Sequence, residues 1–477
     1  MSDRPIVVDL DGTLVHTDVL YESTLRLLRD TPLALAALPA KLAKGKAALK
    51  SHIADRSSVS VATLPYNLEL LEWLREQREQ GRRLVLCTAS NERPAREIAD
   101  HLDLFDEVIA SDEHSNLKGE RKALELCERY GRGGFDYVGD SAADLAVWAC
   151  AAEAVVVNAA PAVAARAAEV AAVSRVFPAP SGGLEVWLRS LRLQQWLKNL
   201  LLFAPMLAAH QFTQPAAWAS LLLAFFAFNC AASATYILND LLDLESDRLH
   251  PNKRRRPLAA GLIPVPSALL ASAVLLLLAV LLALPLGGNF VLCLLSYLLL
   301  TTLYSWRLKQ LILVDCLTLA MLYTLRIIAG AAALDMGLSF WLLAFSVFLF
   351  LSLAFVKRYA ELELQLLEGR EEAHGRGYLT ADAPLVQSLG TAAGYVSALV
   401  LSLYLNSDEV LLLYATPELV WGAVVVLLFW ISWMWLQAHR GKMHDDPLVF
   451  AVSDQASQVA GVLFLATLLL GTVSFPW

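Results

Sequence analysis

The chain has 477 residues, of which 57% are hydrophobic and 18% are charged, and its mean hydropathy is +0.51. This composition is too apolar for an ordinary soluble enzyme of this length. The formal net charge of −8 leaves no excess of basic residues for a large cationic face, so a nucleic-acid partner is not expected. The six cysteines follow no CxxC spacing and no metal-site pattern, which indicates reduced thiols.

The first part of the chain, up to residue 177, alternates short apolar runs with helical stretches. The runs predict strands of a parallel sheet over 5–8, 83–87, 135–138 and 154–157. Residues 20–65 interrupt this alternation with helical sequence rich in Ala, Leu and Lys, which by its position is an inserted cap. The sequence therefore predicts an α/β Rossmann-like domain over 1–177 with a small helical cap.

Side chains suited to phosphate chemistry follow the predicted strands, namely Asp9, Asp11, Thr88, Lys118, Asp140 and Asp144. The carboxyl ends of parallel strands meet at the edge where α/β sheets bind ligands. These residues stand in the stretches IVVDLDGTLVHTD, LVLCTAS, NLKGE and YVGDSAADL. In this order, the stretches resemble the four motifs of the haloacid dehalogenase (HAD) superfamily.

The HAD resemblance implies a role for each motif residue. Asp9 is the expected nucleophile that carries an aspartyl-phosphate, and Asp11 is the expected general acid and base. Thr88 and Lys118 are expected to neutralise the phosphoryl oxygens. Mg²⁺ would draw its ligands from the carboxylates of Asp9, Asp11, Asp140 and Asp144.

Two alternatives stay open for this domain, a degenerate fold without catalysis and a dehalogenase. No motif residue is missing, which argues against the first, and Asp11 two positions after the nucleophile favours phosphatases by resemblance. The cap lysines either form a solvated face or meet an anionic substrate or lipid head groups, and they are Lys41, Lys44, Lys46 and Lys50.

Residues 178–195 read as a Pro/Gly linker followed by a helix that lies at a membrane surface. From residue 196 onward, apolar runs of roughly 20 residues recur, each long enough to cross a bilayer. We predict nine spans, near 197–210, 216–238, 265–286, 289–304, 311–333, 338–356, 386–405, 415–437 and 456–475. The first is short enough to be re-entrant.

The connections between the spans differ in charge. The lysines and arginines are confined to 239–264, 305–310, 357–385 and 438–455, and the alternate connections hold none. By the positive-inside rule, the basic connections are cytoplasmic. Since the N-terminus shows no signal-peptide pattern, we expect the front domain in the cytoplasm and the protein in the plasma (inner) membrane.

The second predicted span runs into the stretch NDLLDLESD. If the helix continues, Asn239, Asp243 and Asp247 follow one another at every fourth position, within about 80° on one face. Such a set fills only part of a Mg²⁺ shell and leaves room for phosphate oxygens. We therefore expect a magnesium diphosphate here, with Asp243 as the central catalytic ligand and Asp240 as a further candidate metal ligand.

A basic block, with Lys253, Arg254 and Arg256, follows the acidic stretch and would supply phosphate contacts. A juxtamembrane charge cluster that only sets orientation is the alternative. That alternative explains the arginines but not the Asn/Asp set.

The acidic motif NDxxDxxxD resembles that of the UbiA superfamily of intramembrane prenyltransferases, as does QQWLKN, which contains Lys198 and Asn199. The resemblance covers about residues 184–477 and implies an all-α membrane domain of nine helices. A second aspartate-rich motif, usual in members that prenylate aromatic rings, is missing, and only Asp315 and then Arg326 stand there. They are eleven positions apart, hence on one helix face about 16 Å apart. A buried arginine in a span is costly and usually functional.

One aspartate motif, a buried arginine and the sequence KRYAE are similar to one branch, the polyprenyl-phosphate phosphoribosyltransferases. Two anionic substrates require more cations than one prenyl diphosphate and a neutral ring. The resemblance implies substrate or phosphate contacts from Lys198, Asn199, Lys253, Arg254, Arg256, Lys309, Arg326, Lys357, Arg358 and Tyr359. No role is assigned to His444, Asp445, Asp446 and Asp454.

The leading hypothesis is a bifunctional, Mg²⁺-dependent membrane enzyme. It would transfer a 5-phosphoribosyl group from phosphoribosyl diphosphate, a small phosphorylated donor, to a polyprenyl phosphate, and the HAD domain would dephosphorylate the lipid-linked product. One alternative is a prenyltransferase that moves a prenyl group from a prenyl diphosphate to an aromatic acceptor, with an independent phosphatase. Another is a non-enzymatic transporter or sensor. The sequence does not predict the oligomeric state.

Overall fold

The computed structural model describes residues 4–57, 59–112, 115–179, 183–211, 213–367, 369, 377–407, 414–443 and 446–473. These residues form two compact units. The first consists of Met1–Leu191 with Tyr236–Ala271, and the second of Arg192–Thr235 with Ser272–Trp477. The segment that contains the aspartate-rich motif therefore belongs to the same unit as the N-terminal domain.

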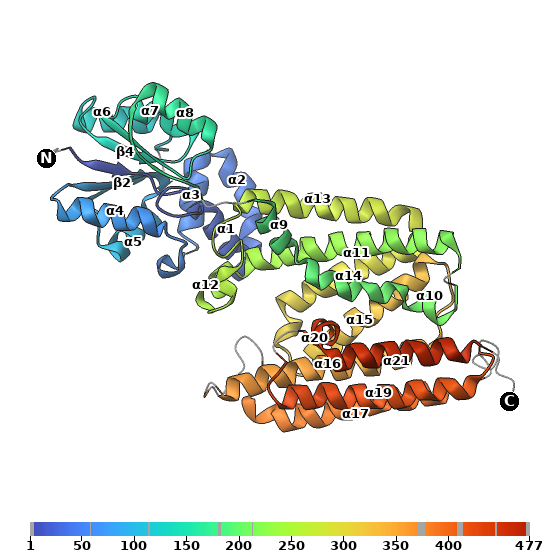
Figure 1. The fold of residues 1–477 in the computed structure, drawn as a ribbon. Coiled ribbons are helices and arrows are strands. Elements are labelled where there is room, and N and C mark those ends of the chain that lie inside the picture. Colours follow the sequence, from blue (N-terminus) through green and yellow to red (C-terminus); the bar gives the residue numbers. More distant parts are fainter. Residues whose placement is uncertain are drawn as a thin grey trace. The chain divides into compact units, whose positions relative to one another are not determined.

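The first unit contains a six-stranded parallel sheet with the order β3-β2-β1-β4-β5-β6 (Figure 1). The four expected strands are present as β1 (Ile6–Val8), β2 (Leu84–Asn91), β4 (Asp136–Gly139) and β5 (Glu153–Val157). The sequence analysis missed the two edge strands, β3 (Glu107–Ser111) and β6 (Ala172–Phe177). Edge strands are more polar because one side lacks a neighbouring strand, and β6 has mostly exposed residues.

Helices cover both faces of this sheet (Figure 1). Alternate side chains of β1 face opposite sides of the sheet. Ile6 and Val8 pack in one hydrophobic core with α4 (Leu68–Glu79) and α5 (Glu92–Leu102). Val7 enters the other core, on the opposite face. That core is formed with α6 (Glu120–Tyr130), α7 (Leu145–Trp148) and α8 (Pro161–Val170). Burial on both faces requires the continuous apolar run of β1.

The expected cap over 20–65 is a set of short helices. It consists of α1 (Val19–Asp30), η1 (Pro32–Ala37), α2 (Leu38–Ala43), α3 (Lys46–Ala54) and η2 (Val61–Thr63). Asp18 caps α1, because its carboxylate accepts a hydrogen bond from the backbone N–H of Leu20. The cap therefore begins directly after the loop that carries Asp9 and Asp11.

The second segment of the first unit joins two long apolar helices. It includes the end of α11 (Pro215–Leu242), α12 (Leu244–Leu249), η5 (Lys253–Arg255) and the start of α13 (Val265–Ala283). The segment predicted to be a helix at the membrane surface is helical over α9 (Leu184–Leu191).

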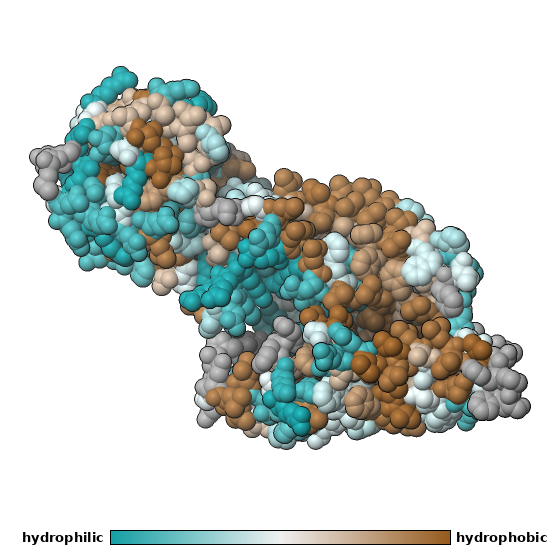
Figure 2. Space-filling model, in the orientation of Figure 1, coloured by the Kyte–Doolittle hydropathy of each residue, from teal (hydrophilic) through white to brown (hydrophobic). Residues whose placement is uncertain are grey.

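The second unit is helical. Its elements include η4 (Leu193–Phe203), α10 (Ala204–Ala208), α14 (Gly288–Trp306), α15 (Val314–Ala333), α16 (Phe340–Leu367), α17 (Ala383–Leu405), α19 (Pro417–His439), α20 (Pro447–Ser453) and α21 (Gln455–Gly471). Figure 1 shows α17, α19 and α21 side by side. In Figure 2, hydrophobic residues form a broad surface over α13, as expected of a helix that contacts lipid.

The expectation of nine spans is not confirmed. Among the described residues, seven helices are long and apolar enough to cross a membrane, or eight if α20 and α21, which meet at an 86° bend, form one broken span. The predicted first span, 197–210, is instead a 3₁₀ helix followed by the five-residue α10, which is too short to cross.

Candidate active sites

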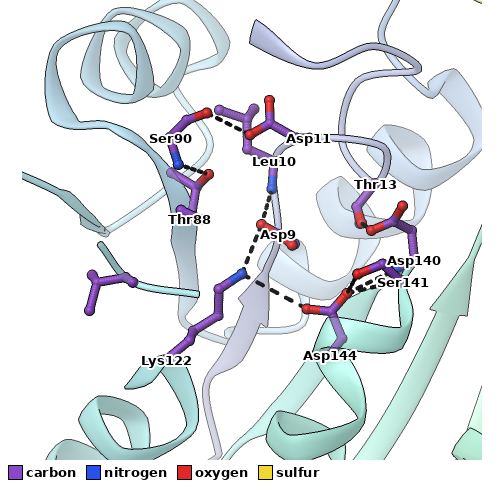
Figure 3. Close-up of polar contacts among 12 residues, drawn as sticks. Asp9, Leu10, Asp11, Thr13, Thr88, Ser90, Lys122, Asp140, Ser141 and Asp144 are labelled. Carbon is purple, nitrogen blue, oxygen red and sulfur yellow. Dashed lines mark hydrogen bonds and ion pairs between the residues drawn. The ribbon is translucent and has the colours of Figure 1, made fainter. Parts of the chain in front are cut away.

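The first candidate site lies at the carboxyl end of the parallel sheet. Asp9 follows β1 directly, and its backbone N–H donates to the carbonyl of Val138 at 3.0 Å. The Asp9 carboxylate accepts a hydrogen bond from the N–H of Leu10 at 2.8 Å and lies 3.0 Å from the ammonium nitrogen of Lys122 (Figure 3). This network fixes the carboxylate at the strand end, where an incoming phosphoryl group can reach it.

Asp11 lies on the cap side of the same loop. Its carboxylate accepts hydrogen bonds from the N–H of Val19 at 2.8 Å and from the hydroxyl of Ser90 at 2.6 Å. Burial and the nearby charge of Asp18 raise the pKa of Asp11 to about 7. Thr88 is fully buried and accepts from the N–H of Ser90 at 3.0 Å. A carboxyl group that titrates near neutrality can donate and later accept a proton.

Three carboxylates form an acidic cluster beside the nucleophile. Oxygens of Asp9, Asp140 and Asp144 lie within 4.8 Å of one another. Burial, with the charges of the other two aspartates, raises the pKa of Asp140 to about 8. Gly12 has a φ of +75°, and a Cβ at this position would lie 2.3 Å from an Asp140 oxygen, so glycine is required for this close approach. Hard carboxylate oxygens concentrated in this way fit Mg²⁺.

Asp144 is held rigidly by its neighbours. Its carboxylate accepts from the hydroxyl of Ser141 at 2.8 Å, from the N–H of Ser141 at 3.0 Å and from the hydroxyl of Tyr137 at 2.8 Å. The Lys122 ammonium in turn donates to the Tyr137 hydroxyl at 2.8 Å. Asp144 therefore orients the site as well as contributing charge.

The lysine at this site is Lys122, which the sequence analysis did not single out. Lys122 is only 2% exposed and contacts Asp9, whereas Lys118 is exposed and lies ahead of α6. The charge of Lys118 acts instead on Asp18. Helical spacing could have revealed Lys122, because it shares the buried face of α6 with Leu126. A lone cation on an apolar helix face requires a buried anion.

One cap lysine reaches the same site. Lys50 donates to the carbonyl of Ala89 and to the side-chain oxygen of Asn116 at 3.2 Å. Lys44 and Lys46 are exposed. The run of cap lysines thus contains a solvated part and one member that lies beside the phosphatase motifs.

The aspartate-rich motif keeps the one-turn spacing of its oxygen ligands. The N–H of Asp243 donates to the carbonyl of Asn239 at 2.9 Å, and the N–H of Asp247 donates to the carbonyl of Asp243 at 2.8 Å. The helix does not continue uniformly, because α11 ends at Leu242 and Asp243 is the N-cap residue of α12. Asn239 and Asp243 are half-buried, and Asp247 is buried.

An arginine of the basic block crosses back to this motif. Arg256 lies 3.1 Å from a carboxylate oxygen of Asp240 and 2.6 Å from one of Asp247. Asp240 and Asp247 are seven positions apart, about 20° on a helical wheel, and although α11 ends between them the guanidinium joins both carboxylates in one network. Lys253 and Arg254 are exposed.

In the second unit, two lysines share one carboxylate. The ammonium nitrogens of Lys198 and Lys357 lie 2.7 and 3.4 Å from the same oxygen of Asp446. The hydroxyl of Tyr323 also donates to Asp446, at 3.2 Å. The cluster lies among η4, α15, α16 and the start of α20, and the side chains named here, all from the described residues, carry two positive charges and one negative charge.

Arg326 lies next to this cluster. Its guanidinium donates to the side-chain oxygen of Asn199 at 2.7 Å, and the Asn199 amide donates to Asn229 at 2.6 Å. The Lys198 ammonium and the Arg326 guanidinium both lie over the ring of Tyr323, 5.6 and 5.7 Å from its centroid. We call Lys198, Lys357, Arg326, Tyr323 and Asp446 the cation cluster.

Arg358 belongs to a separate network. Its guanidinium contacts Asp315 at 2.8 Å and also pairs with Glu361, and the hydroxyl of Tyr378 donates to Asp315 at 2.7 Å. Asp315 and Arg358 are fully buried and paired with each other. The buried arginine of α15, Arg326, therefore does not take Asp315 as its partner.

The remaining candidates are dispersed. Tyr359 hydrogen-bonds to His439 at 2.9 Å, and Lys309 lies in η7 (Leu308–Gln310). Asp454 caps α21 by accepting from the N–H of Ser457. His444 and Asp445 lie outside the described residues.

Comparisons with known proteins agree with this division. The UbiA prenyltransferase family model matches residues 200–468, and the haloacid dehalogenase-like hydrolase model matches residues 6–148. An uncharacterized protein of Sinorhizobium fredii, y4nM, is 37% identical over 98% of this chain and 90% of its own length. The decaprenyl-phosphate phosphoribosyltransferase of Mycolicibacterium smegmatis is 30% identical over 60% of this chain and 90% of its own.

Among solved structures, a UbiA homolog from Archaeoglobus fulgidus bound to GPP and Mg²⁺ is similar at 16% identity and a TM-score of 0.46. The match covers 59% of this chain and 99% of that one. Together with the apolar helices, the family match indicates a multi-pass membrane protein. The chain belongs to the UbiA prenyltransferase family and carries a haloacid dehalogenase-like hydrolase domain at its N-terminal side.

Proposed function

We propose that the membrane part transfers a 5-phosphoribosyl group from phosphoribosyl diphosphate to a polyprenyl phosphate. The cation cluster carries this proposal, because two lysines contact one carboxylate and Arg326 lies beside them over the ring of Tyr323. An excess of buried positive charge favours an anionic ligand. An aromatic acceptor with one carboxylate would compensate less of this charge than a phosphate. The similarity to a named phosphoribosyltransferase supports the same choice.

The aspartate-rich motif would bind the donor as its Mg²⁺ complex. Asn239, Asp243 and Asp247 follow one another at one-turn intervals of the backbone, and their side-chain oxygens would supply part of the shell of a hard cation. When bound, Mg²⁺ neutralises the charge that develops on the departing diphosphate. Arg256, Lys253 and Arg254 would add phosphate contacts around it.

The transfer step substitutes one oxygen for another at the anomeric carbon. An oxygen of the lipid phosphate forms the new bond, and the bond to the diphosphate breaks, so that the diphosphate leaves with the electron pair. The cation cluster would hold the lipid phosphate in position. The product is a lipid-linked ribose that still carries its 5-phosphate.

The hydrolase domain would remove that 5-phosphate. The Asp9 carboxylate would attack phosphorus while Asp11 protonates the leaving oxygen, and Asp11 would then activate the water that releases inorganic phosphate. Lys122 would neutralise charge on Asp9 and on the phosphoryl oxygens. Asp9, Asp140 and Asp144 would hold Mg²⁺. Fusion raises the effective concentration of the phosphatase at its substrate.

We propose that this chemistry takes place on the cytoplasmic side of the plasma membrane, the side that the basic connections favour. Phosphoribosyl diphosphate is a soluble, highly charged donor that is available only from the aqueous phase. A cytoplasmic hydrolase domain and cytoplasmic charged connections are consistent with such a donor.

The decisive experiment supplies the purified chain with labelled phosphoribosyl diphosphate and decaprenyl phosphate, in parallel with a prenyl diphosphate and 4-hydroxybenzoate. We expect a dephosphorylated lipid-ribose from the first pair and no prenylated acid from the second. The reverse result establishes the aromatic prenyltransferase alternative. If neither pair reacts and Asp243→Ala does not change the affinity for either diphosphate donor, the transporter or sensor alternative is favoured.

A further inference from the structure

Two ion pairs join the cap of the hydrolase domain to the helix that follows the aspartate-rich motif. Arg248 donates from its two terminal nitrogens to both carboxylate oxygens of Glu22, at 2.7 and 3.1 Å. Arg26 contacts both carboxylate oxygens of Glu245, at 3.0 and 3.1 Å. Glu22 and Arg26 lie one turn apart on α1, and Glu245 and Arg248 lie one turn apart on α12. We call these four residues the clamp.

The two pairs differ in burial. The side chains of Arg248 and Glu22 are 8% and 6% exposed, whereas those of Arg26 and Glu245 are 33% and 35% exposed. A bidentate guanidinium–carboxylate pair fixes both distance and orientation. Since a buried charge without its partner is costly, the inner pair holds α12 against α1. All four residues line a cavity of about 130 Å³.

The clamp connects directly to the nucleophile loop. The hydroxyl of Thr17 donates to Glu22 at 2.8 Å, and the carbonyl of Thr17 accepts from the N–H of Gly12 at 3.1 Å. The next elements of the loop hold Asp11 through the N–H of Val19. Glu22 therefore contacts the nucleophile loop on one side and Arg248 on the other.

The clamp is also directly connected to the aspartate-rich motif. Arg248 directly follows Asp247, and its third nitrogen donates to the carbonyl of Ala259 at 2.9 Å. A second contact adds to this, because a Cβ on Gly261 would lie 2.7 Å from Cβ of His16. Gly261 has a φ of +72°, so both its conformation and the close approach require glycine.

We propose that the hydrolase domain positions the aspartate-rich segment of the transferase. Glu22 and Arg248 are positioning residues that keep Asp243 and Asp247 arranged for the magnesium diphosphate donor. The inference rests on the proposed function only for the identity of that donor. This positioning role explains why the two ion pairs of the clamp are present. Phosphate hydrolysis alone does not require them, because Glu245 and Arg248 on α12 lie outside the hydrolase domain.

The first test measures amide hydrogen exchange in residues 244–262 of the full-length chain in detergent. Glu22→Gln keeps the size of the side chain and removes the charge, so we expect exchange in this segment to accelerate about tenfold or more. Arg93→Gln is the matched control, because it removes an exposed Arg–Glu pair on α5 and leaves the clamp intact. Unchanged exchange in Glu22→Gln overturns the proposal.

The second test separates positioning from a merely structural tether. We expect Glu22→Gln and Arg248→Gln each to raise KM for magnesium phosphoribosyl diphosphate about tenfold, with kcat changed less than about twofold. The double variant should be no worse than either single variant, because both break the same pair. Arg248→Lys should recover part of the loss. Faster exchange with an unchanged KM shows that the clamp only tethers the segment, and this outcome also overturns the proposal.

A second variant and a metal-affinity measurement test the clamp if the first variant does not fold or the donor is not used. If Glu22→Gln does not fold, Arg26→Gln removes the half-exposed pair, and a smaller effect in the same direction is expected. If the wild-type chain does not use phosphoribosyl diphosphate, the proposed function fails on its own. The clamp is then tested by Mn²⁺ affinity in an Asp140→Asn background, which silences the hydrolase metal site. Equal Mn²⁺ affinities with and without Glu22→Gln contradict the clamp.

Discussion

The two polar sites of this chain have opposite charge imbalances. In the hydrolase domain, the carboxylates of Asp9, Asp140 and Asp144 lie together, and one cation, Lys122, contacts Asp9 and Asp144. In the second unit, within the part of the chain that the structure describes, Lys198 and Lys357 contact one carboxylate, that of Asp446, and Arg326 lies beside them. Buried charge must be balanced, so each imbalance indicates the sign of the missing ligand. The first site calls for a metal cation and the second for an anion.

This comparison also separates sites from structural ion pairs. Arg358 is as deeply buried as any residue of the cation cluster, but the buried carboxylate of Asp315 balances its charge, and the second carboxylate, Glu361, has a side chain that is 37% exposed to solvent. Such a balanced group holds α15 and α16 together without requiring a ligand. The imbalance, rather than burial or the presence of an arginine, identifies the candidate site.

Removal of the nucleophile should have the largest effect. Asp9→Asn leaves the size of the side chain unchanged but abolishes attack on phosphorus, so we expect hydrolysis of the lipid-linked 5-phosphate to fall by about 10³-fold or more. Chromatography of the membrane lipids should show the phosphorylated product accumulating. Continued release of phosphate at the wild-type rate would place the nucleophile elsewhere.

The two lysines of the hydrolase domain provide a direct comparison. Lys122→Met removes the only cation that contacts Asp9 among the described residues, and we expect kcat to fall about 10²-fold or more. Lys118→Met removes an exposed charge and should change kcat far less. Both rates are measured with p-nitrophenyl phosphate. Equal losses of kcat, or a larger loss in Lys118→Met, would assign the role of neutralising the phosphoryl oxygens to Lys118, the lysine that the motif spacing indicates.

These lysines show what the sequence can predict. Motif order correctly placed Asp9, Asp11 and Asp140 just after strands, because local apolar runs predict the strands of a parallel sheet, whereas Thr88 lies inside β2, which continues to Asn91. The choice between Lys118 and Lys122 depends on how α6 rotates against the sheet, which is a tertiary property. The same holds for Asp446, whose partners come from distant helices.

Helix boundaries explain the other differences. Hydropathy predicted a first span over 197–210, but a run of that length cannot show whether it forms one helix or a 3₁₀ helix and a short turn of α-helix. The aspartate-rich motif kept its spacing even though α11 ends within it, because main-chain bonds continue across the break. Local spacing was thus more predictable than element boundaries.

Neutralising the buried arginine of the membrane unit should weaken anion binding. Arg326→Gln keeps a hydrogen-bond donor for Asn199 but removes one positive charge from beside Tyr323. We expect KM for the lipid phosphate to rise about tenfold to 10²-fold, since a hydrogen bond to a charged group contributes about 1.5–3 kcal/mol. Transfer assays at several lipid concentrations measure this change.

The matched control is Arg358→Gln, which removes an arginine whose charge is already balanced by Asp315 and Glu361. That change should lower thermal stability and leave the KM of the folded fraction unchanged. A rise in KM with Arg358→Gln equal to that with Arg326→Gln would remove the distinction between the two networks.

The smallest effect is expected at Asp454, where the charge serves a helix end and no ligand. Its carboxylate accepts from the N–H of Ser457 at 2.8 Å and from the indole N–H of Trp433 at 2.9 Å. Asp454→Ala removes the cap of α21, so we expect about 1 kcal/mol of stability to be lost. Thermal unfolding of the purified chain measures this loss, and transfer and hydrolysis should keep their wild-type KM values. A changed KM would assign Asp454 to substrate binding, because a helix cap acts on folding and not on the donor.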